Sequence, residues 1–557
     1  MTSSALLLSA KQTRPLSRAP FILLRGSQLQ GSPQRDRGQW SPAQSPATSS
    51  PPFTNPESVA LNPVRVFAPA EKPQLQQQQP EEDFQQQQQQ RRREKPKGSF
   101  SQSLAQLTAG LGPEHASPVA RSRASRMMLD AVGVGLLGAR TEVAQIARRH
   151  GELLSAGGPC TAWGSSGVRL SASAAAFVNG VSIHAMDFDD TWHPATHPSG
   201  SLLPALLAAA EAAPAGQKPS GLQLLLAFLV GVEVQGRLLR CSREANDIPK
   251  RFHPPTVVGT IGAAAGCARL LGLEPARCLH ALAIAASFAG APLANAATQA
   301  KPLHAGHAAR MGLEAAALAA SGLHANEAMF DLAERGFGAF YPDYETPRTP
   351  LDPCGGAPLL LEQQDVAFKR FPAHLGTHWV ADAACALRER IASVSGGHVD
   401  TALIESLVLH VPRSAYVDRA FPADEHEARH SFQFVGCSAL LDGAVTRASF
   451  EAPARSRPAL RSLLERTRLE HPRDNVPSFA LMYAEASASV SGLEVSARCD
   501  SFLGHWRRPL GREALLGKFA RNAAGGGVGD ARAAAAAALL EGVEELSDAS
   551  EICRLLH

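Results

Sequence analysis

Long apolar runs rich in alanine and leucine fill most of residues 99–362. Four of them, at 202–213, 222–240, 257–273 and 276–289, are separated by breaks that contain glycine and proline. Ala and Leu are strong helix formers, and abundant small residues let helices pack closely on several faces. The pattern predicts a large all-α helical domain over residues 99–362.

The pattern changes over residues 363–501. Polar and apolar positions alternate along 403–411 and 482–495, as is typical of strands, and a Ser-Gly pair inside the second run indicates a turn. Helical stretches lie between the strand-like runs, at 377–392 and 428–441. We therefore expect a smaller α+β lid domain over 363–501.

Helical sequence returns at 531–546, so residues 502–557 are expected to rejoin the helical domain. The expected fold class is mainly α: a large all-α helical domain plus a smaller α+β lid domain. The longest apolar run, Leu224 to Val232, is much shorter than the roughly 20 apolar residues that span a bilayer. It predicts a buried helix, and no membrane partner is expected.

Residues 1–98 differ from the rest in composition. Glutamine tracts, Pro/Ser clusters and the basic run Arg91 to Arg93 predict a disordered extension. Residues 1–35 contain five Lys/Arg and no acid before Asp36, which is typical of a mitochondrial transit peptide. An ordinary tail or a mispredicted first exon would explain the same composition. Mitochondrial localisation is the expectation.

Charge and cysteine content exclude some classes of function. Residues 1–100 hold 13 Lys/Arg and 7 Asp/Glu, a charge of +6, which leaves about −3 of the net +3 for the rest. The folded part is therefore not basic, and nucleic acid is not expected as a partner. The nine cysteines form no C-x-x-C pair and no zinc-like spacing, so we expect reduced thiols.

Residues 184–199 concentrate ionisable groups inside an otherwise apolar region. This stretch contains three aspartates, three histidines and two threonines, with alanine-rich sequence on both sides. Burying such groups unpaired costs several kcal/mol, so they must be paired, hydrated or used. Pro194 and Pro198 prevent a continuous helix. We expect a loop that leaves a helix end and forms an active site.

Three specific interpretations of this stretch are possible from the residues alone. Residues 187–191 fit the D-x-D-x-T of haloacid-dehalogenase-type phosphotransferases, but residues 174–186 indicate a helix where those enzymes need a strand. The D-x-D-D of class II terpene cyclases also fits, although the chain is only 6% aromatic. A Zn²⁺ or Mn²⁺ site could use His184, Asp187, His193 and His197.

Other polar groups recur in apolar settings along the chain. They lie at 251–255, 295–307, 369–374 and 416–430. Each alone is explained equally well by a structural histidine or an internal ion pair. Together they predict a pocket rich in Lys, Arg and His, which suits a small polycarboxylate.

The run Val178 to Thr191, followed by His197-Pro198-Ser199, resembles the signature of the MmgE/PrpD family. Further blocks resemble the animal members of this family, which decarboxylate cis-aconitate. They are Arg251 to Gly259, Ala291 to Leu303, Asp365 to His374, Glu425 to Phe432, and Gly504 to Arg507. The resemblance spans about 98–520, fades from Asn522 onward and is absent from 1–97.

The resemblance implies a homodimer whose active site lies between a helical domain and an α+β lid. It implies no metal and no organic cofactor. Carried over to matching positions, it implies catalytic roles for His197, Asp187, Lys301 and Tyr416, and substrate-binding roles for Thr191, His253, Lys369 and His374.

The implied reaction is the cofactor-free decarboxylation of cis-aconitate to itaconate and CO₂. His197, oriented by Asp187, is the expected proton donor, because a histidine beside a carboxylate can be protonated near neutral pH. The alternative within the family is a hydro-lyase acting on 2-methylcitrate or citrate. A different class of function is a scaffold whose glutamine-rich tail recruits partners.

Overall fold

The structure is a computed structural model, and it describes residues 98–155, 157–192, 196–244, 251–347, 357–397 and 399–557. The predicted extension and transit peptide, and His193, lie outside the described residues. All described residues belong to one compact unit.

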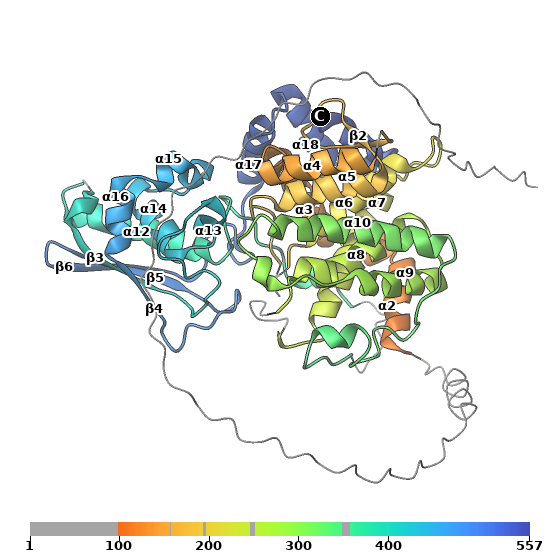
Figure 1. Cartoon of the computed structure of the whole chain (residues 1–557), viewed down its shortest axis with the longest axis horizontal. Coiled ribbons are helices and arrows are strands. Elements are labelled where there is room, and N and C mark those ends of the chain that lie inside the picture. The colour runs from red at the N-terminus through yellow and green to blue at the C-terminus, as the bar shows by residue number, and fades with distance from the viewer. Residues whose placement is uncertain (1–97, 156, 193–195, 245–250, 348–356, 398) are drawn as a thin grey trace, which may run out of the picture. The chain divides into compact units, whose positions relative to one another are not determined.

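Most of the described chain is helical, as the apolar pattern predicted (Figure 1). One group of helices comes from residues 100–363 and from the C-terminal end of the chain. Its members are α2 (Phe100–Gly110), α3 (Pro118–Gly138), α4 (Glu142–Leu154), α5 (Ala172–His184), α6 (Pro198–Ala212), α7 (Gly221–Leu239), α8 (Pro254–Leu270), α9 (Pro275–Phe288), α10 (Lys301–Ala320), α11 (Leu360–Gln363), α17 (Arg512–Gly525) and α18 (Asp530–Glu541).

A second group of elements surrounds a four-stranded sheet. It contains α12 (Thr377–Val394), α13 (Glu425–Arg429), α14 (Phe432–Asp442), α15 (Ala452–Arg455), α16 (Pro458–Glu465), β3 (Ile404–His410), β4 (Thr467–Glu470), β5 (Ala484–Val490) and β6 (Leu493–Cys499). Short 3-10 helices connect elements in both groups. They are Pro113–His115, Leu293–Asn295, Phe337–Phe340, Thr401–Leu403, Arg447–Phe450, Val543–Glu545 and Ala549–Leu555.

The sheet has the strand order β4-β3-β5-β6. The β5–β6 hairpin turns at Ser491 and Gly492, which have positive φ values of 50° and 78°. This confirms the predicted strands and turn. The short β4 was not predicted; it pairs in parallel with β3. The predicted helix over 428–441 is interrupted, because Ser431 caps the start of α14 by accepting a hydrogen bond from the Phe434 N–H.

Helix α7 is the one described helix that is long and apolar enough to cross a membrane by length and composition. Of its most apolar window, 83% is buried inside the protein. Side chains such as Leu224, Phe228 and Val232 have no exposed surface and pack in the core. The helix therefore serves as a core helix, as its short apolar run predicted.

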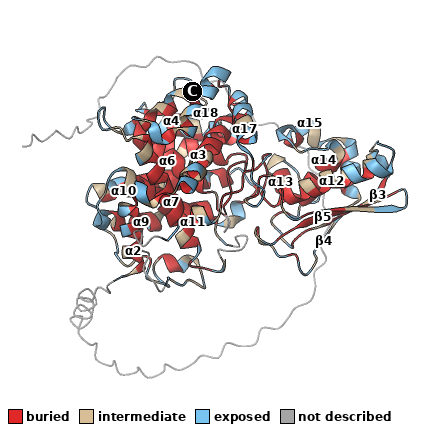
Figure 2. Ribbon diagram, turned by 180° about the vertical axis from the view of Figure 1, so that it is seen from behind, coloured by how far each residue is buried: buried red, intermediate tan, exposed pale blue. Residues whose placement is uncertain are grey.

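Most of the buried apolar side chains belong to two large hydrophobic cores (Figure 2). The first collects buried side chains from Phe100 to Phe368 and again from Leu510 to Leu556. The second collects those from Ala367 to Phe502. The C-terminal helices thus pack with the first core, and α17 lies against α3.

Glycines let α5 and α10 approach closely at the centre of the first core. A Cβ atom on Gly180 would lie 2.8 Å from the Gly306 Cα, and one on Gly306 would lie 2.4 Å from the Phe177 carbonyl oxygen. No larger residue fits at this crossing. The contact places the C-terminal end of α5 beside the start of α10, where Lys301 lies.

Candidate active site

Three helices of the first core begin at one pocket. His197 is the N-cap of α6, His253 is the N-cap of α8, and Lys301 is the first residue of α10. A proline follows each of these residues directly, and proline is favoured at the first helical positions because its ring fixes φ. Unpaired N–H groups and the positive ends of helix dipoles favour anions at such points.

A pocket lies between the two cores, with about 450 Å³ of empty space that includes open solvent. Leu375 and Phe479 of the second core line it together with Pro254, at the start of α8, and Leu293. Six of the eight predicted site residues line it together: Thr191, His197, His253, Lys301, His374 and Tyr416. Polar groups that converge in a partly apolar pocket are typical of a site for a small molecule.

The remaining two predicted residues, Asp187 and Lys369, form an ion-pair group with Lys301 behind the pocket wall. The Lys301 Nζ lies 2.6 Å from Oδ2 of Asp187, and the Lys369 Nζ lies 2.5 Å from Oδ1. Lys369 also donates to the Asp187 carbonyl oxygen at 2.8 Å. All three side chains are buried.

Burial raises the pKa of Asp187, but the charges of Lys301 and Lys369 outweigh it and hold that pKa well below its usual range. His430 adds to this effect, with Nε2 at 3.1 Å from the Asp187 carboxylate. Two ammonium groups thus share one carboxylate. The group keeps one positive charge beside the pocket, which favours an anionic ligand.

His197 is placed differently from the expectation. Its Nε2 is 3.9 Å from the nearest Asp187 oxygen, which is too far for a hydrogen bond, because the two lysines hold that carboxylate. The Nδ1 of His197 instead lies 2.8 Å from the carbonyl oxygen of Asp190. Since a carbonyl only accepts, Nδ1 carries the hydrogen and Nε2 keeps its lone pair.

Burial lowers the pKa of His197 to about 3, although Asp189 and Asp187 act to raise it. The prediction that Asp187 orients His197 and keeps it protonated near neutral pH is therefore wrong for the ligand-free protein. Desolvation of the cationic imidazolium is larger than the attraction of the nearby carboxylates.

The two other aspartates of the stretch anchor the loop. Asp189 lies 2.9 Å from Nδ1 of His184, and this interaction helps to hold its pKa below the usual range despite burial. Asp190 accepts a hydrogen bond from the Ser199 hydroxyl at 2.6 Å. Burial, with no cation to offset it, raises the pKa of Asp190 well above its usual range.

His374 and His253 have assignable partners in the pocket wall. Nδ1 of His374 accepts the Gly376 N–H at 3.2 Å, so the neutral ring carries its hydrogen on Nε2. Nδ1 of His253 lies 3.1 Å from Nδ1 of His304. Burial lowers the pKa of both pocket histidines well below the usual value. Both are neutral donors or acceptors at neutral pH.

Tyr416 and Thr191 complete the polar lining. The Tyr416 ring packs edge-on against His374 at 5.2 Å, and burial raises the pKa of its hydroxyl well above the usual value. It is thus a neutral donor. The backbone of Thr191 exchanges two hydrogen bonds with Ala367, at 3.0 and 2.8 Å. This pairing holds the 187–192 loop beside the segment that carries Lys369.

Two histidines near the pocket were noted from the sequence only as members of polar stretches and were given no role in the site. His430 contacts Asp187, and His304 contacts His253. A usable signal was the repeated pairing of a basic residue with proline at 197–198, 253–254 and 301–302. Each pair marks a helix start, and the three starts converge.

The structure also separates the alternative interpretations of residues 184–199. Helix α5, not a strand, leads into Asp187, so the phosphotransferase arrangement is absent here. In the predicted metal set, Asp187 is occupied by two lysines and His193 lies outside the described residues. His184 and His197 remain close together, with ring centroids 4.7 Å apart.

Models of two domains from one protein family match the chain. The MmgE/PrpD N-terminal domain matches residues 102–349, and the MmgE/PrpD C-terminal domain matches residues 371–542. A relative in Homo sapiens, named cis-aconitate decarboxylase, is 53% identical over 426 residues, which are 76% of this chain and 88% of the human protein. The chain belongs to the MmgE/PrpD family.

Other MmgE/PrpD-type relatives carry the same name. A cis-aconitate decarboxylase of Mus musculus is 50% identical over 460 residues, covering 82% of this chain and 93% of the mouse protein. One from Aspergillus terreus is 32% identical over 221 residues, covering 39% of this chain and 44% of the fungal protein. The two family domains together include seven of the eight predicted site residues, and Lys369 lies in the short segment between the two matches.

Proposed function

We propose that this protein is a cis-aconitate decarboxylase, which converts cis-aconitate to itaconate and CO₂. The observation that carries the proposal is the convergence of three helix N-termini and the Lys301–Asp187–Lys369 group on one pocket. This arrangement favours a ligand with several carboxylates. The relatives that cover most of this chain at 50–53% identity are named for this activity.

The reaction needs few chemical groups. The bond between the CH₂ carbon and its carboxylate breaks, and its electron pair forms a new double bond to the central carbon. The electrons of the old double bond move to the CH carbon next to the far carboxylate, which delocalises them as an enolate. One proton then adds to that carbon. The trianion and one proton thus give the itaconate dianion and CO₂, so no electron-sink cofactor is required.

Binding groups hold the carboxylates and stabilise the enolate. The charge of Lys301, shared with Asp187, lies at the pocket wall, and the neutral His374 can donate from Nε2. Thr191, Tyr416 and His253 add neutral polar contacts, and Lys369 fixes Asp187 from behind. Such groups act by position and electrostatics, which give large rate effects in a site that excludes water.

His197 is the proposed proton donor, through Nε2. In the ligand-free protein Nε2 carries no proton, since burial lowers the pKa of His197 to about 3. Bound carboxylates bring negative charge next to the ring and raise that pKa, because nearby anions favour the imidazolium. Substrate binding therefore brings one proton from solvent onto His197, and the reaction consumes it.

A substrate panel tests the proposal against the hydro-lyase alternative. Full-length protein is incubated separately with cis-aconitate, citrate and 2-methylcitrate, and CO₂ release is measured beside water addition or loss. The proposal expects CO₂ from cis-aconitate and no dehydration of citrate or 2-methylcitrate. Dehydration of either hydroxy acid without CO₂ release would assign the pocket to the hydro-lyase reaction. No reaction at all would favour a binding role.

We also propose that the protein is a homodimer, as the family resemblance implies. Light scattering on the purified full-length chain tests this: a mass near twice the 58.7 kDa of one chain is expected. The mass of a single chain, measured on fully active protein, would contradict the homodimer proposal.

We further propose a mitochondrial location. It is supported by the five basic residues and the lack of any acid before Asp36 in residues 1–35. A reporter fused after residue 35 should collect in mitochondria. A variant with the five basic residues changed to glutamine should not. A cytosolic signal from the unaltered fusion would contradict the proposal.

A further inference from the structure

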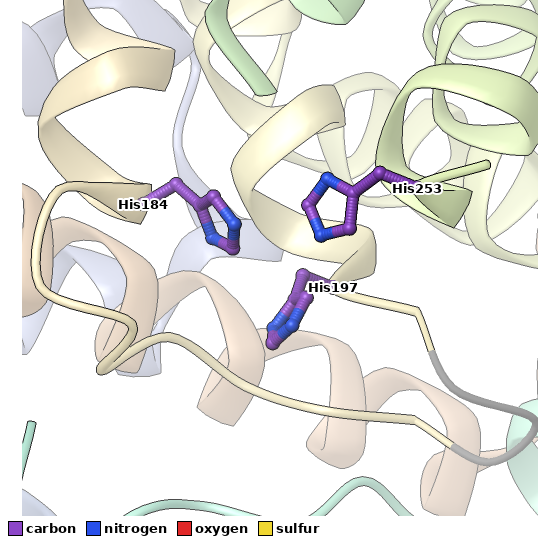
Figure 3. A group of neighbouring side chains, drawn as sticks. All are labelled: His184, His197 and His253. Carbon is purple, nitrogen blue, oxygen red and sulfur yellow. The ribbon is translucent and has the colours of Figure 1, made fainter. Parts of the chain in front are cut away.

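Three imidazoles from three different elements meet beside the pocket (Figure 3). His184 is the last residue of α5, and His197 and His253 cap α6 and α8. One nitrogen from each ring lies within 4.8 Å of those of the other two. We propose that these three histidines form a binding site for a divalent transition metal ion of the zinc class, and that an ion bound there inhibits the enzyme.

His184 is the observation that points to a ligand. Its side chain has no exposed surface, and Nδ1 faces the Asp189 carboxylate at 2.9 Å. Its buried Nε2 has no hydrogen-bond partner among the described residues. A buried polar atom left unpaired costs about 1–3 kcal/mol, so the protein gains when a ligand satisfies it. A carboxylate that orients a histidine in this way is the usual outer partner of a metal ligand.

The other two histidines are held in the same manner. Nδ1 of His197 donates to the Asp190 carbonyl at 2.8 Å, and Nδ1 of His253 contacts His304 at 3.1 Å. Each ring therefore has one nitrogen fixed by a protein partner and a second nitrogen left over.

Three imidazole nitrogens suit zinc, cobalt or nickel ions and not magnesium or calcium, which prefer oxygen ligands. In a tetrahedral zinc site with bonds of about 2.0–2.1 Å, neighbouring nitrogens lie about 3.3 Å apart. The ligand nitrogens must therefore move toward one another by up to about 1.5 Å when the ion binds. Lys301, near the pocket, opposes a cation, whereas Asp189, paired to His184 and 3.5 Å from Nδ1 of His197, favours one.

Inhibition follows from where the ion would lie. His197 and His253 line the pocket, so the fourth metal position faces the space that the substrate carboxylates need. The ion would also occupy the lone pair through which His197 acquires its proton. This inhibitory part rests on the proposed function, whereas the metal site itself does not.

The first test measures binding without turnover. Full-length protein stripped with EDTA is titrated with Co²⁺ near neutral pH, and the visible absorption of tetrahedral cobalt is recorded. We expect one equivalent to bind and Zn²⁺ to displace it. His184→Asn should weaken binding at least tenfold, because the Asn amide keeps the donor to Asp189 but supplies no imidazole nitrogen.

His280→Asn is the matched control, since His280 packs against His324 at 4.7 Å and could bind metal adventitiously. It should leave the cobalt spectrum unchanged. If His184→Asn melts early, His253→Asn serves in its place. No tetrahedral spectrum, or a spectrum that survives both substitutions, would overturn the site.

The second test measures inhibition. Zn²⁺ should slow turnover of cis-aconitate, and EDTA should restore it. In His184→Asn, the Zn²⁺ concentration that halves the rate should be at least tenfold higher. Loss of activity on EDTA treatment would mean that the ion is required, and would overturn the inhibitory part. If the protein turns over no cis-aconitate, the proposed function fails, and the cobalt titration alone decides the metal site.

Discussion

Asp187 is held in the left-handed backbone region, with φ at 51°, which few non-glycine residues adopt. A non-glycine residue in this region costs on the order of 1 kcal/mol or more and needs surrounding contacts to persist. The bonds from Lys301 and Lys369 to both carboxylate oxygens supply those contacts. Asp187 therefore holds Lys301 and Lys369 in place. His197 does not pair with Asp187, and its Nδ1 donates to the Asp190 carbonyl instead.

His197→Asn tests the proton-transfer role directly. The Asn amide can replace Nδ1 as the donor to the Asp190 carbonyl, while the reacting Nε2 is lost. We expect kcat to fall by about 10²-fold or more with little change in melting temperature, since loss of a general acid typically has this effect. Steady-state kinetics with cis-aconitate measure it. A kcat within about twofold of wild type would assign the proton to another group, with Tyr416 the next to test by Tyr416→Phe.

Three helix starts supply the lysine and two of the histidines that line the pocket. Helices α6, α8 and α10 contact one another and present His197, His253 and Lys301 at their first turns. Their alignment depends on the close crossing of α5 and α10 at Gly180 and Gly306. Packing at this crossing should therefore control the position of Lys301 relative to Asp187.

Gly306→Ala tests that dependence. The added Cβ would lie 2.4 Å from the Phe177 carbonyl oxygen, so α10 must shift. Overpacking of this kind costs about 1–3 kcal/mol, and we expect a lower melting temperature with a raised KM. Gly110→Ala in α2 is the control, because no atom lies within 4 Å of its added Cβ. Unchanged stability and KM in Gly306→Ala would show that the crossing tolerates a side chain.

Sequence reasoning predicted the elements better than their contacts. The Ala- and Leu-rich runs identified α6 to α9, and period-two alternation identified β3, β5 and β6. The four-residue β4 was not predicted, because a strand that short shows little alternation of polar and apolar residues. Its parallel partner β3 is also distant in sequence. The break at Ser431 depends on a single side-chain cap, which the apolar pattern does not show.

The site residues were found as a set, but their pairing was not. The eight residues implied by the family resemblance lie close together: six line the pocket, and Asp187 and Lys369 form an ion pair behind it. Which carboxylate pairs with which cation depends on contacts between distant segments, such as Lys369 with Asp187 across 182 positions. The burial that lowers the pKa of His197 likewise depends on the complete fold.

At the scale of the molecule, buried neutral histidines make stability sensitive to acid. Burial lowers the pKa of His197 to about 3 and that of His430 to about 4 in the folded protein, against 6.5 as the ordinary value. Below pH 6.5 the unfolded chain binds these protons and the folded protein does not. The contribution of these neutral histidines to the free energy of unfolding is thus fully present above pH 6.5, and it is lost as the pH falls toward 4 and 3.

We therefore expect the melting temperature to fall steadily from pH 6.5 to pH 4. Each fully buried histidine contributes at most about 1.4 kcal/mol per pH unit in this window. Asp187 adds nothing there, because its folded pKa lies below its ordinary value of 3.8 and its contribution is lost only in stronger acid. Asp190 acts in the opposite direction, because burial raises its folded pKa, but the buried histidines with a lowered pKa, which include His253 and His374, outnumber the buried carboxyls whose pKa is raised. Thermal melts across this range measure the effect, and a flat profile between pH 6.5 and pH 5 would contradict the neutral, buried state of these rings.

Deleting residues 1–97 should leave catalysis and stability nearly unchanged. The family match begins at residue 102, and every pocket residue lies beyond the cut. Truncated and full-length proteins are compared for itaconate formation and melting temperature. A fall of several degrees, or a roughly tenfold loss of rate, would mean that this segment packs on the enzyme. Loss of partner binding alone would support the scaffold function.

The most direct test of the central claim is the reaction of cis-aconitate with the purified protein in D₂O, followed by NMR. Decarboxylation with an allylic shift predicts itaconate and CO₂. The product should carry one deuterium on the CH₂ next to the far carboxylate and none on the olefinic CH₂. Citrate or isocitrate as product, or unchanged cis-aconitate, would contradict the claim, and deuterium at the olefinic carbon would contradict the proposed electron path.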